Sequence, residues 1–116
     1  MILYHYPKCG TCRTARKWLD EQGVTVELVD LTIDTPDVKA LTDLHGRSGL
    51  PLKRFFNTSG QSYRGGGFKD RLPSMSSDDQ LAALAADGKL IKRPILDTGS
   101  TVLVGFKADA WADAVG

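Results

Sequence analysis

Two cysteines three positions apart, Cys9 and Cys12, are the only cysteines of the chain and lie near its start. Residues 2–6 (ILYHY) are apolar and aromatic, which predicts a strand. Pro7 ends this strand, because proline cannot donate a hydrogen bond to a neighbouring strand. Over residues 10–22 the apolar positions recur at the spacing of a helix. The cysteine pair therefore lies where a strand gives way to the first turn of a helix.

The next residues extend this pattern to a strand, a helix and a second strand. Gly23 provides the usual stop for the helix. Residues 24–31 (VTVELVDL) alternate and are rich in β-branched side chains, which predicts another strand. Because the three elements fit within about 30 residues, they predict a parallel βαβ unit with a right-handed crossover.

The middle of the chain is predicted to be helical in part and otherwise irregular. Thr35 is expected to cap a helix that has Pro36 in its first turn and ends near His45. A short helix is expected over residues 51–56. A glycine- and serine-rich loop is expected over residues 57–67 (NTSGQSYRGGG).

The last part of the chain combines a helix, a hairpin and a closing helix. A helix is expected to begin at Ser77 and to stop at Gly88. Two apolar runs, residues 94–97 and 101–105, are joined by a short connection that contains glycine, which is a β-hairpin signal. A final helix is expected over residues 107–115.

This order of elements is that of a thioredoxin-like α/β fold. It would have a four-stranded mixed sheet and an all-helical insertion, about residues 34–90, between the βαβ and ββα halves. No internal repeat and no linker divide the chain, so residues 1–116 are expected to form a single domain.

The composition is that of an ordinary globular protein, with 41% hydrophobic and 25% charged residues. A net charge of +1 gives no global field that would favour nucleic acid. No run approaches the roughly 18 apolar residues that a membrane span requires, and the N-terminus lacks the pattern of a secretory signal. We therefore expect a cytoplasmic protein, and a monomer, that binds neither nucleic acid nor membranes directly.

A Cys-x-x-Cys pair that opens a helix inside a βαβ unit is typical of a redox site. The N-terminus of a helix carries about half a positive charge and unpaired N–H groups, so a thiolate there is stabilised and its pKa falls. Cysteines three positions apart share a helix face, so the second can attack a mixed disulfide formed by the first. We expect Cys9 to be the exposed nucleophile and Cys12, one turn deeper, the resolving thiol.

Basic residues gather at the start of this helix and acidic residues at its end. The helix macrodipole prefers the reverse order, and each misplaced exposed charge costs about 0.3–1 kcal/mol. Such a cost is expected where an anion or a thiolate is bound at the helix N-terminus. The alternative is that these side chains simply point into water. The basic residues are Lys8, Arg13, Arg16 and Lys17, and the acidic ones are Asp20 and Glu21.

A zinc site is the main alternative for the cysteine pair. It would need four protein ligands, commonly a second Cys-x-x-Cys pair or two well-spaced histidines. The only histidines are His5, which lies in a predicted strand before Cys9, and His45, which lies far along the chain. We therefore expect no metal.

The stretch IKRPIL (residues 91–96) is the second informative motif. A proline that opens a strand belongs at a sheet edge or beside a special site, because it has no N–H to donate. In thioredoxin-like folds the proline at this place has a cis peptide bond and faces the cysteines, so we expect Pro94 in the active site. Arg93 would then project near Cys9 and complete a positive pocket.

These motifs together resemble the arsenate reductase ArsC / Spx / YffB family, over essentially the whole chain. The residues that carry the resemblance are Tyr4-His5-x-Pro7-x-Cys9-Gly10-Thr11, then Arg93-Pro94-Ile95, then Leu103-Val104-Gly105. The run from Cys9 to Leu19 is especially similar to Spx-type members.

The resemblance implies roles for several residues. Cys9 matches the nucleophile that attacks arsenate in the arsenate reductases, and Arg93 matches one arginine of their oxyanion site. His5 matches a histidine near the cysteine, although a histidine packed in a strand is an equally good interpretation. The remaining matches are Gly10 and Thr11, which resemble the arsenate reductase loop, and Cys12 with Arg13, which resemble the redox switch of Spx-type members.

The chain also departs from the arsenate reductases. They have asparagine where Tyr6 stands and serine where Cys12 stands. Two further oxyanion arginines align with Asn57 and Gly105, so two cations are lost from a site that must hold a charged oxyanion. Each charged hydrogen bond contributes about 1.5–3 kcal/mol, so arsenate reduction is not the expected activity. Arg54 or Arg64 could substitute, which the sequence leaves open.

The expected function is therefore that of a thiol–disulfide oxidoreductase. Its substrate would be a small-molecule thiol or disulfide, an oxyanion, or a redox partner protein. Glutathione is the expected reductant, and no bound cofactor is expected. The alternative that the resemblance implies is an Spx-type redox-switched transcriptional regulator that binds the RNA polymerase α subunit. Basic residues in the middle of the chain could serve a partner or be solvated surface; they are Lys53, Arg54, Arg64, Lys69 and Arg71.

Overall fold

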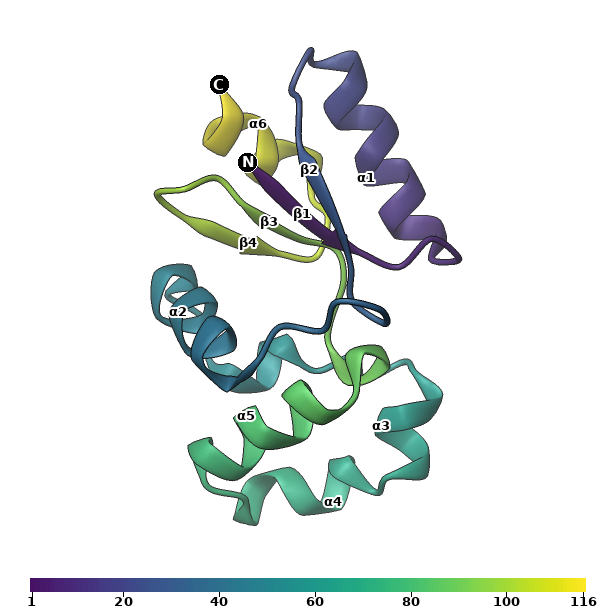
Figure 1. Cartoon of the computed structure of the whole chain (residues 1–116), viewed down its shortest axis with the longest axis vertical. Coiled ribbons are helices and arrows are strands. Elements are labelled where there is room, and N and C mark those ends of the chain that lie inside the picture. Colours follow the sequence, from purple (N-terminus) through teal and green to yellow (C-terminus); the bar gives the residue numbers. More distant parts are fainter.

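The computed structural model describes residues 1–116 and contains a four-stranded mixed sheet with the order β2–β1–β3–β4. β1 pairs with β2 in parallel and with β3 in antiparallel, and β3 pairs with β4 in antiparallel. This confirms the thioredoxin-like topology, including the βαβ unit and the hairpin (Figure 1). The elements of this half are β1 Ile2–His5, α1 Gly10–Glu21, β2 Glu27–Asp30, β3 Ile95–Asp97, β4 Val102–Val104 and α6 Ala108–Val115.

Alternate residues of the strands supply two cores, one on each face of the sheet. Leu3 pairs with Leu96, and both lie in the core under α1 and α6, where Trp111 is buried. Ile95 points to the opposite face and joins a larger core that includes Leu41 of α2. Because side chains alternate along a strand, this register fixes which face each helix covers.

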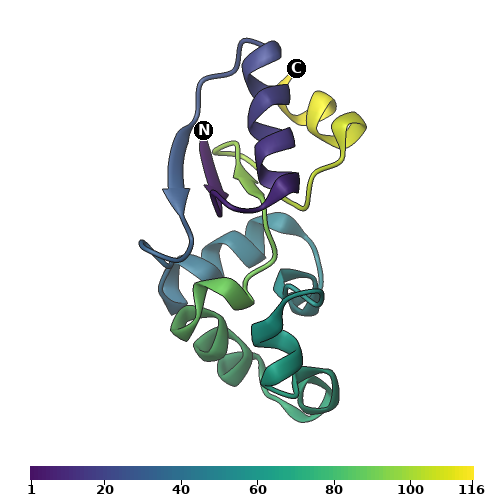
Figure 2. The ribbon, with the colours of Figure 1, turned by 90° about the vertical axis from the view of Figure 1, so that its right-hand side faces the viewer.

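The second half of the molecule is a helical insertion between β2 and β3. Figures 1 and 2 show it as a separate layer of helices beyond one end of the sheet. It packs on the larger core described above, which is mostly aliphatic and also contains the rings of Phe55, Phe56 and Phe68. Its elements are α2 Val38–Ser48, η1 Leu52–Phe55, α3 Gln61–Gly65, α4 Phe68–Arg71, η2 Leu72–Ser74, α5 Ser77–Ala86 and η3 Gly88–Leu90.

The prediction that Thr35 caps α2 was wrong. The cap is Asp37, whose carboxylate accepts a hydrogen bond from the Ala40 N–H at 2.8 Å. Thr35 instead donates its hydroxyl to the carbonyl oxygen of Leu31, which holds the turn that leaves the sheet. The helix also runs on to Ser48, and it ends where Gly49 adopts a left-handed conformation.

The sequence predicted a loop over the glycine- and serine-rich residues 57–67. The structure instead places the short helix α3 within this stretch. Tyr63 of α3 stacks on Phe68 of α4, with ring centroids 6.1 Å apart. These aromatic contacts anchor a segment whose composition is typical of turns. The tertiary contacts of Tyr63 and Phe68 thus outweigh the low helix propensity of the glycines.

Gly88 has a different role from the predicted helix stop. It is buried, and a Cβ placed on it would lie 1.8 Å from the carbonyl oxygen of Leu31. The insertion therefore approaches the chain segment after β2 so closely that no side chain fits at this position. α5 itself ends at Ala86, two residues earlier.

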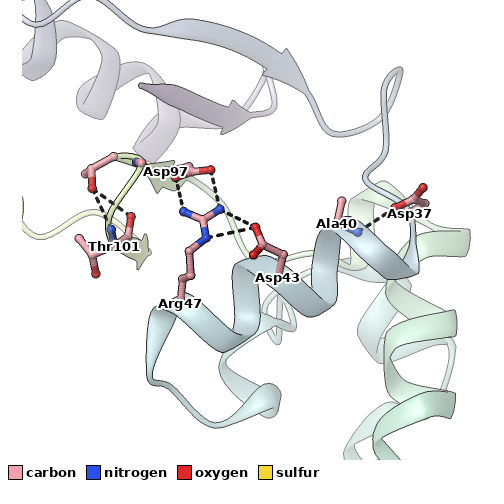
Figure 3. A network of polar contacts seen from close by, with 8 residues as sticks. Asp37, Ala40, Asp43, Arg47, Asp97 and Thr101 are labelled. Carbon is pink, nitrogen blue, oxygen red and sulfur yellow. Dashed lines mark hydrogen bonds and ion pairs between the residues drawn. The ribbon is translucent and has the colours of Figure 1, made fainter.

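An ion-pair network joins the insertion to the sheet (Figure 3). Arg47 of α2 donates from Nη1 to Oδ1 of Asp97 at 2.6 Å and from Nη2 to Oδ2 at 2.9 Å. The same guanidinium contacts Asp43 one turn earlier in α2. Asp97 also accepts a hydrogen bond from the Gly99 N–H, so it fixes the turn of the β3–β4 hairpin as well. None of the helices is long and apolar enough to cross a membrane.

Candidate active site

Cys9 is the N-cap residue of α1 and is partly exposed. The Cys9 N–H donates to the carbonyl oxygen of Tyr6 at 2.9 Å, so the Pro7-Lys8 turn positions the cysteine at the start of the helix. Its Sγ accepts a hydrogen bond from the backbone N–H of Cys12 at 3.3 Å. The thiol therefore takes the place that a serine or aspartate oxygen usually takes at a helix N-cap.

Cys12 lies one turn further along α1 and is fully buried. Both cysteines are free thiols in this structure. Burial, together with the thiolate of Cys9 beside it, raises the pKa of Cys12 to about 12. The pair is thus divided into an accessible sulfur and a protected one, as the sequence predicted.

Arg93 lies beside Cys9, at the other side of the site. The Arg93–Pro94 peptide bond is cis, as the sequence predicted, and Pro94 is buried. The Arg93 guanidinium stacks over the Tyr6 ring at 5.0 Å and donates to the Lys89 carbonyl oxygen at 3.1 Å. These contacts hold the cation in the position that favours a thiolate at Cys9.

The pKa of Cys9 lies below its ordinary value, because its hydrogen bonds and the nearby positive charge together outweigh the effect of burial. Partial burial alone would raise the pKa of this thiol. The hydrogen bonds from the Cys12 side chain and backbone, together with the hydrogen bond and charge of Arg93, outweigh burial. Cys9 is therefore predisposed to be the nucleophilic thiolate of the pair.

A cavity of about 290 Å³ opens beside Arg93 and is lined by further basic residues. Arg54 of the insertion lines it, whereas Arg64 does not, so of these two arginines only Arg54 lies at the cavity. Lys92 and Lys107 also line it. Sequence reasoning missed Lys107, which lies outside the motifs, and Lys92, which lies within IKRPIL but was given no role there. No carboxylate contributes to the lining, so the cavity suits an anion. Its lining residues are Thr11, Arg54, Lys92, Arg93, Val104, Gly105, Phe106 and Lys107.

Gly105 and Asn57 are the two residues that align with oxyanion arginines of the arsenate reductases, and they differ in their relation to this cavity. Gly105 lines the cavity with a φ of 77° and donates its N–H to the Pro94 carbonyl oxygen at 2.8 Å. Asn57 lies outside the lining, and its N–H donates to Leu90. Neither residue supplies a cation, and the cations of the cavity other than Arg93 come from Arg54, Lys92 and Lys107.

His5 lies at the end of β1, is 5% exposed, and has no hydrogen-bond partner at Nδ1. Burial lowers the pKa of its imidazole, and the positive charge of Arg16 lowers it further. His5 is not among the residues that line the cationic cavity. Its position agrees with the packed-histidine interpretation.

The predicted supporting residues of α1 divide between two sides of the helix. Gly10 and Thr11 form its first turn next to Cys9, and the Gly10 carbonyl oxygen accepts a hydrogen bond from Thr14 at 3.1 Å. The Arg13 backbone N–H donates to the Cys9 carbonyl oxygen at 3.1 Å, but its side chain makes no hydrogen bond or ion pair with either cysteine and lines a groove between α1 and β2. The basic residues of α1 therefore do not all converge on the thiolate.

The fold and this site define a thioredoxin-type protein with a Cys-x-x-Cys pair at a helix N-terminus. Residues 4–114 match the ArsC family, and the chain belongs to that family. It is 48% identical over 113 residues to the uncharacterized protein YusI of Bacillus subtilis, which covers 97% of this chain and 96% of that protein.

A crystal structure of a putative ArsC family related protein from Bacteroides fragilis superposes with a TM-score of 0.95 at 42% identity, covering 97% of this chain and 95% of the other. An arsenate reductase of Neisseria meningitidis is 29% identical over 104 residues, which is 89% of this chain and 87% of that protein. The regulatory protein MgsR of Bacillus subtilis is 23% identical over 106 residues, which is 91% of this chain and 82% of that protein. The family thus contains relatives named as enzymes and a relative named as a regulator.

Proposed function

We propose that this protein is a thiol–disulfide oxidoreductase that reduces disulfides bearing acidic groups. The observation that carries the proposal is the contact between the Cys9 Sγ and the Cys12 N–H at the start of α1, at 3.3 Å. A sulfur held there is stabilised as a thiolate by the helix N-terminus and by Arg93.

In the first step the Cys9 thiolate attacks one sulfur of the substrate disulfide. A bond forms between Cys9 and that sulfur, the substrate S–S bond breaks, and one substrate thiolate leaves. This product takes up a proton, and Cys9 is now held in a mixed disulfide.

In the second step Cys12 loses its proton and attacks the Sγ of Cys9, which releases the other substrate thiol. The thiolate of Cys9 is one cause of the high pKa of Cys12, and that negative charge disappears once Cys9 is covalently bound. The pKa of Cys12 therefore falls in the mixed disulfide, when the resolving thiol is needed. An external thiol returns the Cys9–Cys12 disulfide to the dithiol in two exchange steps. Glutathione serves this role when the substrate is a different acidic disulfide, because a cycle that both reduces and forms glutathione disulfide has no net reaction.

The cationic cavity supports the choice of an acidic substrate. Arg54, Lys92 and Lys107 lie with Arg93 around this cavity, with no carboxylate to neutralise them. Cys9 does not line the cavity, but Arg93, which lines it, also acts on the Cys9 thiol. Carboxylates of a disulfide such as glutathione disulfide would be attracted to these cations.

The experiment is a turnover assay, with dithiothreitol as the reductant, that compares glutathione disulfide with hydroxyethyl disulfide, which has no charged groups. Cys9→Ser is expected to abolish turnover of both. Lys107→Gln is expected to raise KM several-fold for glutathione disulfide only, and Lys39→Gln, an exposed cation on α2, is the control. Equal KM changes for both substrates would contradict the role of the cavity, and turnover by Cys9→Ser would contradict the mechanism. Arsenate is included as a third substrate because relatives are named arsenate reductases.

A redox-switched regulator is the second candidate, favoured by the similarity to MgsR. In that case the Cys9–Cys12 dithiol would control binding to the RNA polymerase α subunit. Capture of the purified α subunit that depends on the redox state of the pair, without turnover of any disulfide, would support this candidate over the enzyme.

A further inference from the structure

A second groove, of about 610 Å³, lies between α1 and β2. On the α1 side it is lined by Arg13, Arg16 and Lys17, and Asp20 is the only acidic residue of the lining. Its floor is apolar and comes from residues that point toward α1, including Val26 and Leu28. Leu28 is 42% exposed, so it adds apolar surface to the solvent side of the groove.

The three cations along this groove have no partner within the chain. The salt bridges of the structure are those of Arg47, and no side-chain hydrogen bond involves Arg13, Arg16 or Lys17. Arg13 lies three and four residues before the other two, so like charges face one another on the same side of the helix. A like-charged row beside exposed apolar side chains indicates that an acidic, partly apolar partner is missing.

β2 supplies a backbone edge along the same groove. It is the outermost strand of the sheet on this side, and nothing lies beyond it (Figures 1 and 2). The N–H groups of Glu27 and Leu31 donate to β1, at Met1 and His5. Since backbone groups alternate along a strand, the N–H and C=O of Leu28 point outward, where an added strand could pair with them.

We propose that this surface binds an extended acidic segment of a partner protein, which adds to β2 as a further strand. Its backbone would pair with Leu28, and its carboxylates would contact the cations of α1, while its apolar side chains cover Leu28 and Val26. A second copy of this chain fits poorly, because pairing two β2 edges would bring two rows of cations together. The proposal does not depend on the oxidoreductase activity, since none of these residues lines the cationic cavity at Arg93.

The test uses the full reduced chain and a short fluorescent peptide that repeats two glutamates followed by two valines, which places both kinds of side chain on each face of an extended strand. Fluorescence anisotropy is expected to show binding that weakens with salt, and the counterpart peptide with lysine in place of glutamate should not bind. Reversing the charges (Arg13→Glu, Arg16→Glu and Lys17→Glu together) should weaken binding of the acidic peptide on the order of tenfold or more, which corresponds to about 1.4 kcal/mol. Lys39→Glu, on α2, is the matched control and should leave binding unchanged.

Leu28→Pro tests the strand pairing separately. It removes the outward N–H of Leu28 without removing a hydrogen bond to β1, so it should weaken binding more than Leu28→Ala does. Far-UV circular dichroism shows whether each variant is folded, and backbone NMR shifts show where the peptide lies on the wild type. The proposal is overturned if the acidic peptide does not bind, if charge reversal on α1 has no effect, or if binding is instead lost in Lys107→Glu.

Discussion

The guanidinium of Arg47 donates two hydrogen bonds, of 2.6 and 2.9 Å, to the carboxylate of Asp97 and so connects α2 to β3. The Arg47 side chain is 28% exposed and that of Asp97 is 12% exposed, so the pair is largely withdrawn from water. Hydrogen bonds from Arg47 hold the pKa of Asp97 below its ordinary value, although burial opposes this. The pair joins the helical insertion to the sheet that carries the cysteines.

Arg47→Met is expected to lower the free energy of unfolding by about 2–3 kcal/mol, because it leaves the Asp97 carboxylate without its main partner in a poorly solvated place. Urea denaturation at pH 7 measures this. The stabilisation is present above the pKa of an unfolded aspartate, about 3.9, and is lost as the pH falls through the lower folded pKa. The difference between wild type and variant should therefore shrink below about pH 4; a constant difference would contradict the assignment.

Gly88→Ala is expected to destabilise the protein by on the order of 2–3 kcal/mol, because the added Cβ would meet the Leu31 carbonyl oxygen and force the two segments apart. Gly46→Ala is the matched control, since Gly46 lies inside α2 with nothing within 4 Å of an added Cβ. That change should stabilise by about 0.5–1 kcal/mol through helix propensity. Thermal unfolding of both variants checks the pair, and similar effects from the two would refute the close approach at Gly88.

His5 is expected to make stability fall as the pH drops below about 6.5, the pKa of an unfolded histidine. Its folded pKa is lowered by burial and by Arg16, so the unfolded chain binds the proton more readily in this range. Urea denaturation at pH 7.5 and pH 5.5 should show a loss in the wild type and a smaller loss in His5→Leu. An unchanged slope in the variant would mean that another group titrates.

Arg93→Met is expected to raise the pKa of Cys9, because the cation that favours its thiolate is removed. The pH dependence of the iodoacetamide reaction at Cys9 measures this, and Cys12→Ser is the background that leaves one thiol to titrate. At neutral pH the variant should react several-fold more slowly than its parent. Lys89→Met is the control, since only the backbone carbonyl of Lys89 contacts Arg93. If the pKa of Cys9 is the same in the variant and its parent, Arg93 does not stabilise the Cys9 thiolate.

The sequence predicted the sheet and α1 well because their signals are local. Strands such as residues 2–6 and the hairpin carry alternating or short apolar runs, and Gly23 ends α1 with a φ of 71° as a glycine stop requires. The insertion was predicted less well, since α3 depends on aromatic contacts between Tyr63 and Phe68 that no local pattern reveals.

The same contrast applies to the site. Cys9, Cys12 and the cis Arg93–Pro94 bond were predicted because they form motifs with a known place in the fold. Lys92 and Lys107 were missed, because only the folded chain brings single lysines from a loop and a helix N-cap to one cavity. The sequence showed that basic residues cluster in α1, but it did not show that the side chains of Arg13, Arg16 and Lys17 face the groove beside β2 and not the cavity at Arg93.

The most direct test of the account is to trap the mixed disulfide. Cys12→Ser, treated with glutathione disulfide and analysed by intact-protein mass spectrometry, is expected to accumulate one glutathione on Cys9, while wild type passes on to the internal Cys9–Cys12 disulfide. Cys9→Ser should remain unmodified over the same time, because its remaining thiol is buried and has a raised pKa. Modification of Cys12 in Cys9→Ser at the rate seen for Cys9, or a wild type that never forms the internal disulfide, would contradict the proposed roles of the two thiols.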